Sequence, residues 1–428
     1  MALRVSHEWL PLSSEDPAEV ATWGTLRLEL DDPQVVLTEA EDLRAQTVCQ
    51  DVAGALLPLA DWLARKWLLL FRSPRICLAS GSRAERYSWE RSHCLRFVGD
   101  GTALPDLCFE PAGRDAIRLR WRSDGGEPER PLRFLLSSNS ATLLRGKVEV
   151  PLAALVDGVL ARLRLRAPGA PALVSLDDSW VRARSAAHAD HQPARLAAFA
   201  GLDWSLLEET QRDTWRARGG KASLLFEQAL AALPPNEPVH ADSLASALTQ
   251  AAGLAELGTS WDALRKRVGR AQSGLPWEVG WDCAHRLRRA MGKDHDEPFS
   301  PPSLEPVATS FDIETAVAVV DGREPVRFVA DPSKDNRFKR ARDVWPVLFG
   351  EHSAGTAWGS VFSRRSDADF SVARAFSAEL LAPIAGIKRR IAGAADEDDI
   401  PWLAHELGGA PEGCVRHQLE NHKLLVAP

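Results

Sequence analysis

Histidines beside carboxylates are the residues of this chain best suited to hold a metal or move a proton. Two clusters come closest, His188-Ala-Asp-His191 and His405-Glu406. The first has polar, loop-like flanks and no third ligand at a plausible spacing, so we interpret it as a solvated linker. The second does not begin an HExxH zinc helix, because Gly409 stands where the second histidine would be. The histidines therefore predict no metal site.

The cysteines also predict no metal chemistry. The chain contains six of them, Cys49, Cys77, Cys94, Cys108, Cys283 and Cys414. They form no CxxC pair, and a zinc ribbon needs paired close ligands. Residues 1–7 carry no apolar secretion signal, and a disulfide framework is typical of small secreted chains. We expect buried or reduced thiols and no cofactor.

Length and charge limit the class of protein. A chain of 428 residues predicts two or three domains. The net charge of −7 argues against a globally basic nucleic-acid binder but allows a local basic face. The best apolar run, 67–71, is far shorter than the roughly 18 residues of a membrane span. We therefore expect a cytoplasmic protein with no membrane partner.

The fold class that the patterns predict is α+β. Residues 1–185 read as an antiparallel sheet with a helix across it, because apolar and polar residues alternate in several short segments. The expected strands are 25–30, 116–122, 130–136 and 147–150. The expected helices are 56–71 and 151–163. Trp62 and Trp67 are expected to pack on this sheet rather than to form an interaction surface.

The rest of the chain is expected to be mostly helical. Residues 186–275 predict a small helical region, with helices at 195–207, 223–233 and 241–251. Asp242 or Ser243 is the expected cap of the last of these. Residues 276–428 predict a third domain with a small sheet. Its expected elements are a helix at 276–292, strands at 315–320 and 326–330, and helices around 373–383, 384–391, 402–407 and 414–422.

One helix of this third domain carries a family resemblance. Residues 373–383 read ARAFSAELLAP, an Arg-Phe pair precedes them at Arg337 and Phe338, and two short helices close the chain. This combination resembles the ImmA/IrrE-type metallopeptidases, whose domain is zincin-like. In that family the Arg-Phe pair leads into an HExxH zinc helix.

The resemblance implies that the metal-binding positions have changed. Arg342 stands where the first zinc histidine would be, Asp343 at the general-base glutamate, Pro346 at the second histidine and Phe370 at the third ligand. A guanidinium stays protonated and proline has no ligand atom, so neither binds zinc. Asp369 is next to Phe370 but faces another side of a helix. We expect no catalytic residue and no metal, and a helix that begins near Asp343 as its cap.

We expect hydrophobic and basic side chains to fill the former metal pocket. Phe370, Ala373, Phe376 and Leu380 form an apolar stripe at helical spacing. The groove that remains is predicted to be formed by Arg337, Arg342, Asp343, Asp369, Arg374 and Glu379.

The function implied by the resemblance is regulatory. Members of the family typically recognise helix-turn-helix repressors in bacterial phage, mobile-element or stress-response loci. A member without its metal is expected to bind another protein, with anti-phage defence as a possible setting. One alternative is a nucleic-acid-binding regulator that uses a basic surface of Arg340, Lys388, Arg389 and Arg390. The other is a hydrolase with an unrecognised active site.

Overall fold

The chain divides into two compact units. The computed structural model describes residues 1–428 except 74–82, 100–102, 113–114, 125–131, 187–191, 220–223, 234–237, 257–259, 270, 301–303, 312, 321, 351–356, 364–369, 392 and 427–428. Unit 1 is Met1–Ala222 and unit 2 is Ser223–Pro428. The middle region that we expected as a separate part is thus divided between the two. Both units mix helices and strands, which confirms the α+β class.

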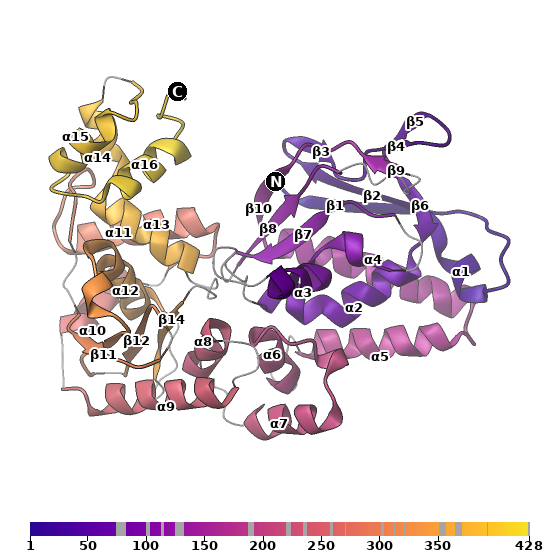
Figure 1. Cartoon of the computed structure of the whole chain (residues 1–428), viewed down its shortest axis with the longest axis horizontal. Helices are drawn as coiled ribbons and strands as arrows, with labels where there is room; N and C mark the ends of the chain where they lie inside the picture. Colours follow the sequence, from indigo (N-terminus) through magenta and orange to yellow (C-terminus); the bar gives the residue numbers. More distant parts are fainter. Residues whose placement is uncertain are drawn as a thin grey trace. The chain divides into compact units, whose positions relative to one another are not determined.

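Unit 1 is built on antiparallel sheets (Figure 1). In the first sheet, β2 (Trp23–Asp31) pairs with β1 (Leu3–Trp9), β3 (Gln34–Val36) and β6 (Val52–Ala55). In the second, β8 (Ala116–Trp121) lies between β7 (Leu107–Pro111) and β10 (Asn139–Leu144). In the third, β4 (Ala40–Asp42) lies between β5 (Thr47–Cys49) and β9 (Leu132–Phe134). Every second residue of β2 is buried, as its apolar alternation predicts.

The helices of unit 1 cover this framework. They are α1 (Pro17–Thr22), α2 (Leu57–Arg72), α3 (Arg83–His93), η1 (Leu95–Phe97), α4 (Gly146–Arg166), α5 (Pro171–Ala186), α6 (Gln192–Phe199), η3 (Trp204–Leu206) and α7 (Glu209–Gly219). Trp62 and Trp67 of α2 are both buried in the core, and the ring of Trp67 packs edge-on against Trp180 of α5 at 4.8 Å. This confirms the packing role expected for both tryptophans.

The strand expected at 147–150 is wrong. These residues form the first turn of α4, which begins at Gly146 and runs through Pro151. Val148, Leu152 and Leu155 are all buried along one side of the helix. A proline this close to the helix start removes only one backbone hydrogen bond, and the buried apolar face outweighs that loss.

One disulfide corrects the expectation that all thiols are reduced. Cys94, just after α3, is bonded to Cys108 of β7 across an antiparallel bridge. The two cysteines are 14 positions apart in the sequence, so no short motif predicts the pair. Cys283 and Cys414 are buried free thiols, as expected, whereas Cys49 is half-buried. Cys77 lies outside the described residues.

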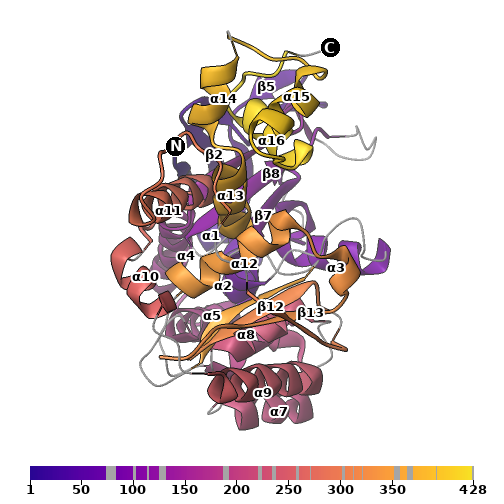
Figure 2. The same cartoon turned by 90° about the vertical axis from the view of Figure 1, so that its left-hand side faces the viewer.

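Unit 2 has a four-stranded sheet between two layers of helices (Figure 2). The strand order is β11 (Pro306–Ala308), β13 (Val326–Val329), β12 (Thr315–Val319) and β14 (Trp358–Phe362), with only β11 and β13 parallel. Helix α12 (Arg337–Phe349) lies on one face, and α8 (Leu224–Ala232) and α9 (Pro238–Leu254) lie on the other.

Most of the remaining helices of unit 2 lie where the sequence predicted them, but the helix at Ser260–Val268 was not predicted. They are α10 (Ser260–Val268), α11 (Pro276–Ala290), α13 (Phe370–Leu381), α14 (Ile384–Arg390), α15 (Asp399–Glu406) and α16 (Glu412–Asn421), with a short η4 at Pro332–Lys334. The cap expected at Asp242 or Ser243 is wrong, because α9 already begins at Pro238. Proline suits the first helical position, where its missing N–H costs no hydrogen bond.

One stretch is apolar and long enough to cross a membrane by length and composition alone. It is Phe370–Arg390, which comprises α13 and α14, and 67% of its most apolar window is buried inside the protein. The sequence prediction overlooked this stretch, since Ser371, Arg374 and Glu379 interrupt its apolar run. Pro383 ends the first helix, and α13 packs as a core helix.

Candidate functional site

Helix α12 carries Arg342, Asp343 and Pro346, three of the residues singled out in the sequence. It begins at Arg337, and the side chain of Asn336 caps it by accepting a hydrogen bond from the Lys339 backbone N–H at 3.0 Å. The expected start at Asp343 is therefore wrong. Pro346 lies inside the helix, where it removes the hydrogen bond to the Arg342 carbonyl. The helix continues because its last turns are buried in the apolar core of unit 2.

Asp343 is the centre of a buried ion network rather than a helix cap. It is fully buried. Its Oδ2 accepts a hydrogen bond from Arg327 Nε at 2.7 Å, and its Oδ1 accepts from Thr315 Oγ1 at 3.0 Å. Oδ1 also accepts from Nε and Nη2 of Arg342, each at 3.0 Å. Both carboxylate oxygens are thus held by cations, as a buried charge requires.

Arg342 places a fixed positive charge between two aromatic rings. Its guanidinium carbon lies 4.4 Å from the ring centre of Phe362 and 5.5 Å from that of Phe370. The same guanidinium donates to Glu314 Oε1 at 3.0 Å and to Thr315 Oγ1 at 2.6 Å. These contacts combine cation–π and charge-assisted hydrogen bonds, which suit the planar arginine group.

The positive charge of Arg342 lowers the pKa of its acidic partner, Glu314. Burial would raise the pKa of Glu314, but the charge and hydrogen bond of Arg342, with Lys339 beside it, outweigh burial and bring the pKa below its usual value. The Glu314 carboxylate is therefore ionised at neutral pH and balances Arg342.

Arg327 completes the network from strand β13. It is fully buried and also donates to Asp335, at 2.6 Å and 3.2 Å. Burial would lower the pKa of Arg327, but its bonds to Asp335 and Asp343 outweigh burial and raise the pKa above its usual value. Every long side chain of this network has an opposite charge beside it, so burial leaves no ion uncompensated.

The donors of this network do not fit zinc. A catalytic zinc needs three free ligand atoms from histidine or carboxylate and an open fourth position. Here both oxygens of Asp343 and Oε1 of Glu314 are bonded to guanidinium groups, and Arg342 has no lone pair to offer. The arrangement can order helix α12 against the sheet.

Phe370 behaves as the sequence predicted. It begins α13 and packs against the core that contains Ala373, Phe376 and Leu380, which confirms the apolar stripe. Exposed Arg374 reaches back over its ring at 5.5 Å. Basic and aromatic side chains thus lie together around Phe370. Asp369 and residues 188–191 lie outside the described residues.

Glu379 joins three helices of unit 2. It is fully buried in α13. Its Oε1 lies 3.0 Å from His285 Nε2 of α11, and its Oε2 accepts from Gln418 Nε2 of α16 at 2.7 Å. Arg288 of α11 is buried as well, and its Nη1 lies 3.8 Å from Glu379 Oε1. This side chain fixes the helices rather than facing a ligand.

The predicted groove residues are therefore not gathered along an open groove. Arg342, Asp343 and Glu379 are buried and bonded to neighbours within unit 2. Arg337 donates to Ser300 Oγ and to the carbonyls of Gly408 and Gly409. The interior could satisfy these polar groups only through partners that are distant in sequence, which the sequence pattern did not reveal.

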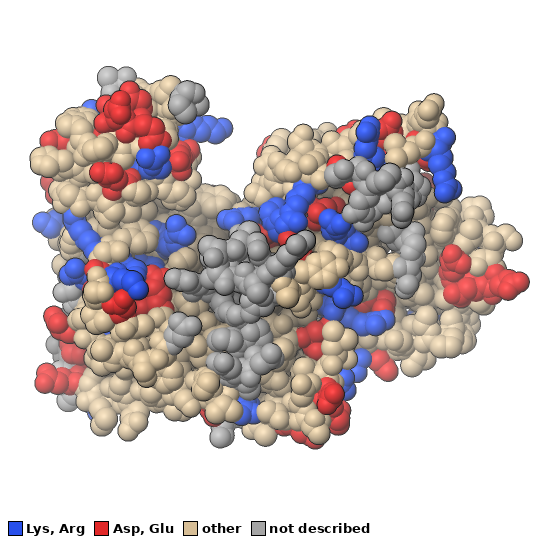
Figure 3. Space-filling model, viewed as in Figure 1, with Lys and Arg blue, Asp and Glu red and all other residues tan. Residues whose placement is uncertain are grey.

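The predicted basic surface is largely paired. Arg340 lies 3.4 Å from Asp335, and Arg389 forms an ion pair with Asp296. Arg390 donates to the Gly386 and Glu406 carbonyls, while Lys388 is exposed. Figure 3 shows basic and acidic side chains interspersed on the visible face. Paired charges give a weak field for phosphate.

Several members of the network were not predicted from the sequence. Glu314, Thr315 and Arg327 contact Arg342 or Asp343 from the sheet and its loops, and Asp335 in turn pairs with Arg327. Arg327 did carry a signal, because it alternates in phase with buried Val329 along a strand. A charge at a core-facing strand position predicts a buried partner.

The comparisons add no relative. No family model, curated protein or solved structure matches the chain.

Proposed function

We propose that unit 2 is a metal-free relative of the ImmA/IrrE-type metallopeptidases that acts by binding another protein. The observation that carries the proposal is the contact between Arg342 and Phe370. These two residues stand at positions aligned with the first and third zinc ligands, 28 residues apart in sequence, and the Arg342 guanidinium lies 5.5 Å from the Phe370 ring. Positions aligned with ligands of one ion are expected to meet in space, and these two meet.

The charge of Arg342 also supports the proposal. In a zinc site a buried cation holds nearby carboxylates and orders the helix that ligates it. Here a permanent cation on that helix holds Asp343 and Glu314. Such a replacement keeps the fold without the metal and removes the Lewis acid.

An exposed tryptophan supports a role in protein binding. Trp402 on α15 is 48% exposed, although most large aromatic side chains of unit 2 are buried. Tryptophan is enriched among the residues that dominate binding energy at protein interfaces. Three of the four residues of the predicted basic surface, Arg340, Arg389 and Arg390, are paired with acids or carbonyls, which favours protein over nucleic acid as the partner.

Restoring the ligands tests the resemblance. The variant Arg342→His, Asp343→Glu, Pro346→His, Phe370→Glu should bind one Co²⁺ with the visible absorption of a tetrahedral site, whereas the natural protein should show none. Near-ultraviolet circular dichroism checks that the variant is folded. A folded variant without cobalt absorption would show that the four positions do not converge and would refute the proposed ancestry.

Capture from the native host tests the binding role. A protein that co-purifies with the natural chain should be lost with Trp402→Ala, because an exposed aromatic anchor is removed. The matched control is His405→Ala, on the same helix and with a side chain that is 87% exposed. Loss of the captured protein after nuclease treatment would favour the nucleic-acid alternative instead.

A further inference from the structure

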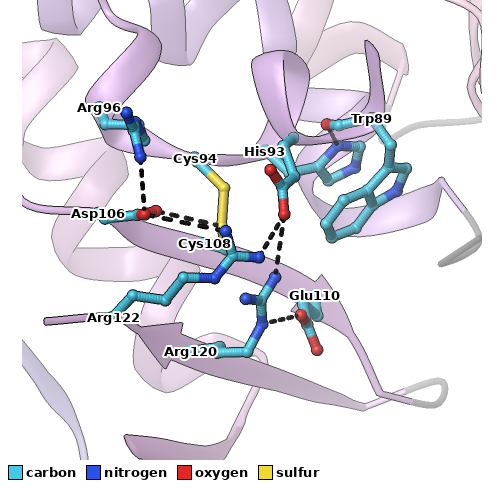
Figure 4. The surroundings of a disulfide bond; sticks show 10 residues. Trp89, His93, Cys94, Arg96, Asp106, Cys108, Glu110, Arg120 and Arg122 are labelled. Atoms are coloured by element: carbon cyan, nitrogen blue, oxygen red, sulfur yellow. Dashed lines mark hydrogen bonds and ion pairs between the residues drawn. A yellow bond between two sulfur atoms is a disulfide. The ribbon is translucent and has the colours of Figure 1, made fainter. Parts of the chain in front are cut away.

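The Cys94–Cys108 disulfide of unit 1 is surrounded by a dense cluster of charges (Figure 4). Arg96 Nη1 lies 3.1 Å from Asp106 Oδ2, and Arg122 Nη1 lies 3.9 Å from the same oxygen. Cys108 Sγ lies 3.9 Å from Asp106 Oδ1. One carboxylate thus stands directly beside the disulfide and is held by two guanidinium groups.

The rest of the cluster connects α3 to strand β8. Glu90 of α3 forms an ion pair with Arg122 and lies 3.9 Å from Arg120. Arg120 Nε in turn donates to Glu110 Oε1 at 2.6 Å. Arg96, Arg120 and Arg122 therefore face Glu90, Asp106 and Glu110, so the cluster has three positive and three negative charges.

This balance disfavours a metal at the site. Cys94, Asp106 and Cys108 offer ligand atoms that all lie within 4.8 Å of one another. Asp106, however, is already neutralised by Arg96 and Arg122, and a cation would have to displace them. The remaining chemistry available to Cys94 and Cys108 is reduction and re-formation of their disulfide bond.

The disulfide is enclosed, and α3, which ends at His93 immediately before Cys94, packs against β7, the strand of Cys108. Both cysteines are fully buried, so a thiol cannot reach either sulfur while this packing is intact. The Glu90 ion pairs hold α3 at the solvent edge, where the side chain of Arg122 is 38% exposed. The ring of His93 provides a second hold, since its nitrogens lie 2.8 Å from the Trp89 carbonyl and 3.1 Å from the Leu69 carbonyl.

The free thiols of unit 2 are protected in a different way. Burial raises the pKa of Cys283 to about 12 and that of Cys414 to about 12, so neither forms the thiolate needed for exchange near neutral pH. These two residues serve as internal standards for thiol reactivity.

We propose that Cys94 and Cys108 form a reversible thiol–disulfide site whose access is controlled by the Glu90 ion pairs of α3. The reductant is a dithiol. One of its thiolates attacks a cysteine sulfur, the Cys94–Cys108 bond breaks, and the other cysteine leaves as a thiolate that takes up a proton. The second thiol of the reductant then displaces the first cysteine. Two electrons and two protons pass to the protein, and the reductant becomes a cyclic disulfide.

Reduction of the native protein tests the proposal. The full chain is treated with dithiothreitol at neutral pH without denaturant, quenched by alkylation and mapped by mass spectrometry. We expect labelling of Cys94 and Cys108 but not of Cys283 or Cys414, unchanged far-ultraviolet circular dichroism, and faster tryptic cleavage at Arg83 and Arg91 of α3. Glutathione disulfide should restore the bond.

Paired variants test the control by α3. Glu90→Gln should speed reduction of the disulfide about fivefold. The reason is that loss of one surface ion pair favours local opening of α3 by about that factor. Arg91→Gln, on the exposed side of the same helix, should leave the rate unchanged. If Glu90→Gln does not fold, Arg122→Gln replaces it. A bond that resists dithiothreitol until the chain unfolds, thiols that never pair under glutathione disulfide, or equal rates for the two variants would each overturn the proposal.

Discussion

The two units differ in the polar groups that they bury. The core of unit 2 contains a network of full charges, with Arg327, Arg342 and Asp343 all buried. Unit 1 buries Glu110 against Arg120 and also the uncharged ring of His93, and a covalent bond joins the residue after α3 to β7. Buried ions are costly unless every one is paired, whereas a disulfide or a neutral ring carries no such condition.

This difference bears on what the polar groups of each unit do. Replacing a buried ion network by apolar residues is often neutral or stabilising, so such a network is weak evidence for stability. The network of unit 2 includes Arg342 and Asp343, two of the positions on which the proposed relationship to a metal site rests. In unit 1, Glu90 pairs with Arg122 next to β8 and His93 bonds to Leu69 of α2, so these polar groups stabilise the position of α3.

Removing the central carboxylate of unit 2 should have the largest effect. Asp343→Asn leaves Arg327 and Arg342 buried without their shared charge partner and should destabilise unit 2 by about 3–5 kcal/mol. Hydrogen-exchange mass spectrometry separates the units, and the loss of protection should be confined to peptides of unit 2. Asp331→Asn, at a surface turn where the side chain is 42% exposed, is the control and should change protection little. Equal effects of the two variants would contradict the role given to Asp343.

The second-largest effect is expected from acid, which should destabilise unit 1 through His93. Burial lowers the pKa of His93 from 6.5 to about 4, although two carbonyl bonds favour the charged ring. The unfolded chain therefore binds more protons between these values, so stability falls as the pH drops from about 6.5 to 4, by on the order of 3 kcal/mol.

The variant His93→Gln measures this effect, because it has no group that titrates in that range. Urea unfolding at pH 7 and pH 4.5, followed by hydrogen exchange in α3 and β7, should show a smaller pH dependence than the natural chain. His405→Gln, at an exposed position of unit 2, should retain the full dependence. An unchanged pH dependence in His93→Gln would assign the acid sensitivity to other groups.

The surface pairs of unit 2 should contribute least. Arg389 pairs with Asp296 but its side chain is 59% exposed. Arg389→Ala should therefore cost less than about 1 kcal/mol, and even this should fade in high salt because exposed charges are screened. Thermal unfolding at two salt concentrations checks the value. A loss as large as that of Asp343→Asn would erase the distinction between buried and surface pairs.

Local patterns predicted β2 and most of the long apolar helices. They gave no prediction for α3, α5, α7, α10 or most of the short strands, and they were wrong where two local signals compete. The alternation of β2 and the apolar stripes of α2 and α13 each point to one structure. Residues 147–150 alternate like a strand and precede a proline, yet they form helix because Val148 packs with the later apolar residues of α4. Pro346 stays inside α12 for a similar reason. Long-range burial decides such cases, and a short window does not contain it.

The sequence by itself determined that Arg342, Pro346 and Phe370 offer zinc no ligand, because that follows from the chemistry of each side chain. It also determined the apolar stripe of α13 from helical periodicity. The tertiary structure alone decided that Asp343 would meet Arg327, that Glu379 would meet Gln418, and that Cys94 would meet Cys108. Each of these pairs joins different elements of one unit, and their partners are set by the folding of the chain rather than by the neighbouring residues.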